Sequence, residues 1–143
     1  MKKKYLVEKT SPVHASARHI FNILLRLERW NLWTQSVTGI STLNNASVEV
    51  GTKLRVLQPK LSPAIWIITK IDQDKILIWE KRSLGLKMIS EHLIHSDANE
   101  TKVTIRMNYE GPLAGLIYQL TRSLTNRYMT MEINGLKKES EKL

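Results

Sequence analysis

The C-terminal segment, residues 111–143, reads GPLAGLIYQLTRSLTNRYMTMEINGLKKESEKL. Its apolar or small residues recur at steps of three and four, at Leu113, Leu116, Ile117, Leu120, Leu124, Tyr128, Met131 and Gly135. On a helical wheel they fall in a stripe roughly 120° wide, which is typical of a helix that packs one face against a core. Gly111-Pro112 marks the start, because proline is tolerated in a first turn. The pattern predicts one long helix over residues 113–139, about 40 Å in length.

The region before this helix alternates apolar and polar residues and is interrupted by turn residues. Asp72-Gln73-Asp74 and residues 96–100 are the clearest turns. Such a pattern predicts an antiparallel meander. The expected strands cover residues 2–9, 37–43, 51–58, 64–71, 75–82, 86–95 and 101–110.

Two short helices are expected between the first two strands. Ser16 is a good N-cap for a helix that runs to about Arg26, and a second helix over residues 27–35 carries Trp30 and Trp33. The fold class is therefore α+β. A large sheet must bury one face, and the long helix is the element able to cover it. Because a twisted sheet curls around a helix without filling the whole concavity, a pocket is expected between them.

Composition indicates a single domain, residues 1–143. The chain is 42% hydrophobic and long enough for one core, and it has no apolar run of membrane-spanning length. The absence of cysteine excludes disulfides, thiolate catalysis and Cys-based metal sites. The N-terminus begins with lysines but no apolar segment follows them, so a cytoplasmic location is expected.

The chain is basic, with 22 Lys and Arg against 13 Asp and Glu and a net charge of +9. The charges are dispersed, and in the tail Lys137, Lys138 and Lys142 are interleaved with Glu139 and Glu141. The sequence contains no standard nucleic-acid-binding motif. We expect a mainly solvated basic surface, no nucleic-acid partner, and at most weak contact with an anionic membrane.

A series of short motifs extends from Tyr5 to Glu141. They are Trp30-Asn31-Leu32-Trp33, Val50-Gly51-Thr52, Pro63-Ala64-Ile65-Trp66, Leu77-Ile78-Trp79, Glu91-His92, Thr101-Lys102-Val103-Thr104, Tyr109-Glu110-Gly111-Pro112-Leu113-Ala114, Arg127-Tyr128 and Glu132-Ile133-Asn134-Gly135-Leu136-Lys137. In order and spacing they resemble the START-like or Bet v 1-like (SRPBCC) helix-grip superfamily, in its polyketide cyclase/dehydrase-like branch. The resemblance implies a curved antiparallel sheet wrapped around the long C-terminal helix, with a cavity for small hydrophobic molecules. Only some members of that superfamily are enzymes, and no catalytic signature is carried over.

Both faces of the central hairpin are apolar, so its inward face has to be chosen. One face carries Trp66, Ile68, Leu77 and Trp79, and the other carries mainly isoleucines. Two exposed tryptophans would leave more apolar surface in water than β-branched side chains, so the tryptophan face is expected to point inward. The motifs that carry the family resemblance also include Trp66 and Trp79. With this parity, the residues expected to line the cavity and bind ligand are Val56, Gln58, Trp66, Ile68, Trp79, Met88, Ser90, His92, Ile105, Met107, Tyr109, Leu116, Leu120, Leu124 and Arg127.

Each candidate has a structural interpretation beside the functional one. The two tryptophans are first of all core residues. His92 is expected to be a buried, hydrogen-bonded histidine, with acid–base catalysis as the alternative. In the simplest interpretation Gln58, Ser90 and Tyr109 satisfy one another's hydrogen bonds, and Arg127 lies at the surface or at the pocket rim. No two histidines have the spacing of a zinc motif, so neither a metal nor a cofactor is expected.

Three functions stay open at this point. The favoured one is binding of a lipid-like or polycyclic, polyketide-like molecule for carriage or sensing. The alternative is a polyketide cyclase or dehydratase in which His92 moves protons while Tyr109 or Arg127 polarises a carbonyl. The third is a membrane-surface or partner-docking protein that uses its basic termini. An enzyme needs His92 within hydrogen-bond reach of an open cavity, whereas a carrier needs only volume. The ligand itself, and the choice between monomer and homodimer, are left open.

Overall fold

The computed structural model describes residues 5–142, and its elements follow the order predicted from the sequence. In chain order they are β1 (Tyr5–Pro12), α1 (Ala17–Leu25), the 3₁₀ helix η1 (Leu27–Leu32), β2 (Gly39–Thr42), the 3₁₀ turn η2 (Leu43–Asn45), β3 (Lys53–Leu57), β4 (Ala64–Asp72), β5 (Ile76–Ser83), β6 (Leu86–Ser96), β7 (Thr101–Glu110) and α2 (Ala114–Ser140). The first predicted strand is displaced toward Pro12, and the lysines before Tyr5 lie outside the described residues. The fold is α+β, a curved antiparallel sheet with a long C-terminal helix.

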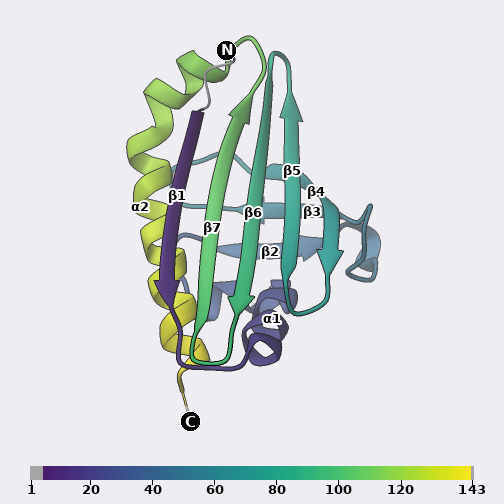
Figure 1. The fold of residues 1–143 in the computed structure, drawn as a ribbon. Coiled ribbons are helices and arrows are strands. Elements are labelled where there is room, and N and C mark those ends of the chain that lie inside the picture. Colours follow the sequence, from purple (N-terminus) through teal and green to yellow (C-terminus); the bar gives the residue numbers. More distant parts are fainter. Residues whose placement is uncertain (1–4, 143) are drawn as a thin grey trace.

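The strands of the described chain form a seven-stranded antiparallel sheet in the order β1-β7-β6-β5-β4-β3-β2. Figure 1 shows β1, β7, β6 and β5 side by side, with β2 and β3 crossing behind them, so the sheet is strongly curved. Helix α2 lies along the open side of this curve, in contact with β1 and β7. Helix α1 covers one end of the sheet and contacts β6 and the C-terminal helix.

Local sequence explains where these elements begin and end. Ser16 caps α1, since its hydroxyl accepts a hydrogen bond from the His19 amide at 3.1 Å. Asp74 has a φ of 64° in the turn between β4 and β5, a left-handed conformation that Asp tolerates better than most residues. On the outer face of the sheet, Arg106 of β7 pairs with Glu8 of β1 and Glu91 of β6. This row of charges marks the solvated face.

The tryptophan face of the central hairpin points inward, as predicted. Trp66 and Trp79 are each 5% exposed, whereas Ile65 on the opposite face is 43% exposed. Trp30 of η1 enters the same core, with its indole donating to the Leu24 carbonyl at 2.9 Å. Its ring lies 5.1 Å from the Trp79 ring, and together they fill the end of the concavity next to α1.

Helix α2 has 27 residues, about 40 Å, and is continuous. Its C-terminal half approaches η1 at Gly135, where a Cβ would lie 1.9 Å from the Trp33 carbonyl oxygen. Only glycine allows this contact. At the other end, Gly111 has a φ of 109°, and a Cβ there would lie 2.7 Å from the Gly85 carbonyl oxygen. The turn between β5 and β6 therefore fits tightly against the start of α2.

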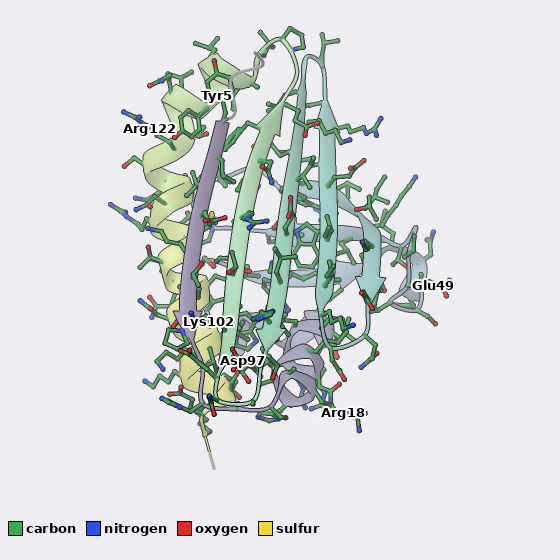
Figure 2. All side chains as sticks on the ribbon, viewed as in Figure 1. Tyr5, Arg18, Glu49, Asp97, Lys102 and Arg122 are labelled. Carbon is green, nitrogen blue, oxygen red and sulfur yellow. The ribbon has the colours of Figure 1, made fainter. Side chains whose placement is uncertain are left out.

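Aromatic side chains fill the junction between α2 and β1. Tyr118 of α2 lies between Tyr5 and Tyr109, with ring centroids 5.4 Å and 5.5 Å away. The Arg122 guanidinium lies 5.9 Å from the Tyr118 ring centre. Figure 2 shows Tyr5 and Arg122 at the same end of the molecule, beside the first turns of α2. These contacts hold the N-terminal half of the helix at the edge of the sheet.

We expect Gly135→Ala to destabilise the protein by about 3 kcal/mol, because an added methyl group collides with backbone that cannot move aside cheaply. Helix propensity alone predicts the opposite, a gain of about 1 kcal/mol. Chemical denaturation of both proteins measures the difference. Asn134→Ala, at the exposed neighbouring position, is the control and should cost little. A Gly135→Ala protein as stable as wild type would show that α2 is not held this closely.

Candidate functional site

A cavity of about 300 Å³ lies between the inner face of the sheet and α2. It is lined by Trp30, Ser36, Val37, Ile40, Val56, Gln58, Leu61, Ser62, Pro63, Ala64, Trp66, Trp79, Lys81, Leu86, Met88, Ser90, Met107, Ile117, Thr121, Leu124, Thr125, Tyr128, Met129 and Glu132. Leu61, Ser62 and Pro63 of the loop after β3 are exposed, so this loop borders the opening to solvent. The volume is at the small end of the range for ligand pockets, about 300–1,000 Å³.

Cross-strand register divides the inner face of β5, β6 and β7 into three successive rows. The rows are Leu77–His92–Ile105, called here the core row, Trp79–Ser90–Met107, called the cavity row, and Lys81–Met88–Tyr109, called the end row. All three residues of the cavity row line the cavity, and none of the core row does. Side chains of the core row are 0–1% exposed. The concavity is thus solid at one end and hollow over the next two rows.

The solid end carries a buried polar pair. As expected, His92 is buried and hydrogen-bonded, with Nδ1 3.0 Å from the Leu77 carbonyl oxygen and Nε2 3.0 Å from Oε1 of Glu132. A carbonyl oxygen only accepts, so Nδ1 carries a proton and donates. The contact between Nε2 and Glu132 needs one further proton, because two facing lone pairs would repel. Whether this proton is on nitrogen or on oxygen, the pair has no net charge.

Glu132 belongs to the cavity lining, whereas His92 does not. Both ring nitrogens of His92 are occupied within the protein. Direct catalysis by His92 therefore stays a prediction from sequence, and any proton exchange with a molecule in the cavity would pass through Glu132. Glu132 was missed in the sequence, although it follows Leu124 and Tyr128 at helical spacing on the same face.

The hollow end carries a single amine. Lys81 follows Trp79 on the inward face of β5, and its Nζ lies 5.8 Å from the centre of the Trp66 ring. Burial lowers the pKa of Lys81 from its ordinary value. The adjacent Glu80 pairs with Arg82 and Lys87 instead. Within the described chain Lys81 has no ion pair and no hydrogen bond.

Eight of the fifteen residues predicted from sequence to line the cavity do so. They are Val56, Gln58, Trp66, Trp79, Met88, Ser90, Met107 and Leu124. The other seven residues lie in the core or at the surface.

Four of those seven, Ile68, His92, Ile105 and Tyr109, are core residues rather than cavity residues. Ile68 and Ile105 are 0% and 1% exposed, and His92 of the core row is 1% exposed. Tyr109 is 3% exposed, and its hydroxyl is hydrogen-bonded to Thr125 at 2.6 Å and to Thr121 at 3.3 Å. The expectation that Gln58, Ser90 and Tyr109 satisfy one another is therefore wrong.

The predicted face of α2 is wrong in its N-terminal half. Leu116 and Leu120 are 58% and 71% exposed and do not line the cavity. Arg127, in the middle of α2, does not line it either; it is exposed, as its interpretation as a surface residue requires. Thr121 and Thr125 face inward instead, because Tyr109 supplies partners for their hydroxyl groups. The spacing of the leucines along α2 does not indicate that these threonines face inward.

Gln58 and Tyr128 hold the loop that borders the opening. The Gln58 side-chain amide donates to the Ser36 carbonyl at 3.1 Å, and the Tyr128 hydroxyl donates to the Pro59 carbonyl. Tyr128 is 9% exposed and comes from the middle of α2. These bonds connect the loop after β3 to both walls of the cavity.

Among residues 5–142, no three His, Asp or Glu side chains gather closely enough to hold a metal ion. In the same part of the chain, no helix is both long and apolar enough to cross a membrane. The candidate site is the cavity between the sheet and α2, with a mainly apolar wall and a few polar groups.

The curved sheet and the long helix define the class, which is a helix-grip protein. The chain belongs to the polyketide cyclase/dehydrase and lipid transport family, whose model matches residues 5–141. A comparison of the sequence with curated proteins found no match.

Solved structures of the same fold come from bacteria and plants. A START superfamily protein from Mycobacterium smegmatis is 17% identical, with a TM-score of 0.71 over 96% of this chain and 99% of the other. The Zhui aromatase/cyclase from Streptomyces sp. R1128 is 14% identical, with a TM-score of 0.76 over 97% and 94%. Major latex-like protein 151 from Panax ginseng is 11% identical, with a TM-score of 0.70 over 97% and 99%. At these identities the likeness shows the fold alone.

We expect Lys81→Met to raise the melting temperature of the ligand-free protein near pH 7. Burial lowers the pKa of Lys81 from 10.5, so the unfolded chain holds this proton more tightly than the folded protein. Wild-type stability then gains from Lys81 as the pH rises from the folded pKa to 10.5, and the advantage of the variant shrinks over that window. Thermal melts of both proteins at pH 7 and pH 10 measure the difference in melting temperature.

The control for that prediction is Lys70→Met, which removes the same charge from an exposed position on β4. It should change the melting temperature little at either pH. Equal destabilisation by Lys81→Met at both pH values would contradict a desolvation cost at this amine.

Proposed function

We propose that the protein binds a compact apolar molecule in the cavity between the sheet and α2. The observation that carries this proposal is the cavity itself, because protein interiors are normally packed to the density of organic crystals. Here about 300 Å³ is left next to three indole rings, those of Trp30, Trp66 and Trp79. Aromatic walls with a few polar groups are typical of sites for small organic ligands.

The comparisons support the same class of ligand. The family description includes both polyketide cyclases and lipid transport, and one solved structure of this fold is an aromatase/cyclase. For this chain we propose a lipid-like or cyclic ligand of limited size, either a compound of one or two rings or a medium-length acyl chain, since the volume is small. Carriage or sensing requires no chemistry beyond this binding.

We expect methyl 2-naphthoate to bind and to change the tryptophan fluorescence. Trp66 and Trp79 line the cavity, so most of this change should disappear in a Trp66→Phe, Trp79→Phe double variant. Leu124→Trp should fill the cavity and weaken binding at least about tenfold, at a cost in stability of about 1–3 kcal/mol from overpacking. Fluorescence titration and native mass spectrometry measure the affinity.

Leu120→Trp is the matched control, because Leu120 precedes Leu124 by one turn of α2 and is 71% exposed. This variant should bind as wild type does. If methyl 2-naphthoate and a wider screen of fatty acids, sterols and aromatic polyketides all fail to bind, the proposed function is wrong. Equal effects of the two tryptophan variants would contradict the proposed location.

A second candidate function is proton transfer to or from the bound molecule. It is favoured by Glu132, whose carboxyl group lines the cavity while His92 holds its other side. As a carboxylate, Glu132 would accept an acidic C–H proton from a ketone and leave an enolate, and His92 would act as a positioning residue. Return of a solvent deuteron to the enolate carbon would complete an exchange cycle.

We expect wild-type protein to accelerate deuterium exchange at the α-carbon of 2-tetralone, measured by NMR. Glu132→Gln should abolish the acceleration and leave the affinity for 2-tetralone within about twofold, because an amide neither accepts that proton nor changes the volume much. Exchange no faster than in buffer, or equally fast with Glu132→Gln, would exclude this second function and leave the first untouched.

A further inference from the structure

We infer that the ligand carries an anionic oxygen, such as a carboxylate, that pairs with Lys81 while its apolar body lies against Trp66 and Trp79. This inference rests on the proposed function and specifies the class of ligand. It comes from the distribution of charge along the cavity.

Two lining residues among those described, Lys81 and Glu132, carry groups that are ordinarily charged at neutral pH. Glu132 is paired with His92, and the proton count given above makes that pair neutral as a whole. Lys81 has no such partner in the described structure. Among the described lining residues, one charge is therefore uncompensated, and it is positive.

The two groups lie at opposite ends of the hollow. Glu132 contacts His92 of the core row, while Lys81 belongs to the end row. On β5 these rows are four residues apart, from Leu77 to Lys81, which is about 13 Å along an extended strand. A ligand with one charged end and an apolar body therefore has a defined orientation in the cavity, with its anionic end away from the Glu132 carboxyl group.

The position of the amine favours a bound anion over simple exposure to water. Lys81 has the parity of Trp79, so its side chain starts on the inner face, and Nζ lies 5.8 Å from the Trp66 ring centre. An aromatic face attracts the cation but supplies no hydrogen-bond acceptor equal to an oxygen. Burial lowers the pKa of Lys81, which is a cost to the empty protein that an anionic partner would reverse.

The apolar residues between the two ends match the rest of such a ligand. Met88 faces Lys81 across the strand pair, and Ser90 and Met107 continue the wall toward the core row. Methionine adapts to ligands of different shape. Either an aromatic acid or an acyl-chain acid fits this chemistry, and the experiment separates these two sources.

The test compares each acid with its uncharged ester. Wild-type protein is titrated with 2-naphthoate and methyl 2-naphthoate, and with decanoate and methyl decanoate, at pH 7.5. We expect the acid of at least one pair to bind about tenfold more tightly than its ester, the lower end of what a hydrogen bond to a charged group contributes. The pair with the larger preference identifies the aromatic or the acyl-chain source.

Lys81→Met should remove this preference, so that the acid and the ester of each pair bind to the variant with affinities within about twofold of each other. Their binding also shows that the variant is folded. Lys81→Arg should keep the preference, because it keeps the charge. Lys70→Met removes the same net charge from an exposed position and should bind both compounds as wild type does, so it separates local pairing from the general attraction of a basic protein.

Retention of the acid preference in Lys81→Met, or equal affinities of acids and esters in wild type, would overturn the inference while binding of the esters still supports the proposed function. Failure of every acid and ester to bind would instead overturn the proposed function, and the inference with it.

Discussion

The distance between α2 and the sheet is the constraint on which the rest of the structure depends. It is set near the C-terminal end by Gly135 against the Trp33 carbonyl, and nearer the N-terminal end by the Tyr109 hydroxyl between Thr121 and Thr125. The first contact brings the helix down onto a solid core. The second holds it by polar side chains that do not fill the concavity, and the cavity lies between these two supports.

This arrangement separates stability from binding. The core row and Trp30 supply the close packing that stabilises a domain of this size, whereas the cavity row and the end row leave apolar surface without protein partners. Lys81 adds a partly buried amine to the same region. A protein selected for stability alone would fill this volume, so its cost is best explained by occupancy.

Most of the fold was predictable because alternation and turn residues act locally. The meander, the N-cap at Ser16 and the length of α2 all follow from residues close in sequence. Burial also favours one parity, and the tryptophan face was predicted correctly. The inner face of α2 was predicted incorrectly, because the exposure of Leu116 and Leu120 depends on Tyr109, a residue on another element. Lys81 was overlooked although the parity that buries Trp79 also points Lys81 inward.

The central claim is that the concavity is hollow over the cavity row and solid over the core row. The most direct test is NMR of the methionine methyl groups during titration with methyl 2-naphthoate. Met88, Met107 and Met129 line the cavity, and Met131 on the same helix does not. The account predicts that the methyl signals of the first three shift with a single affinity while Met131 stays in place. Shifts of equal size at all four, or at none, would contradict it.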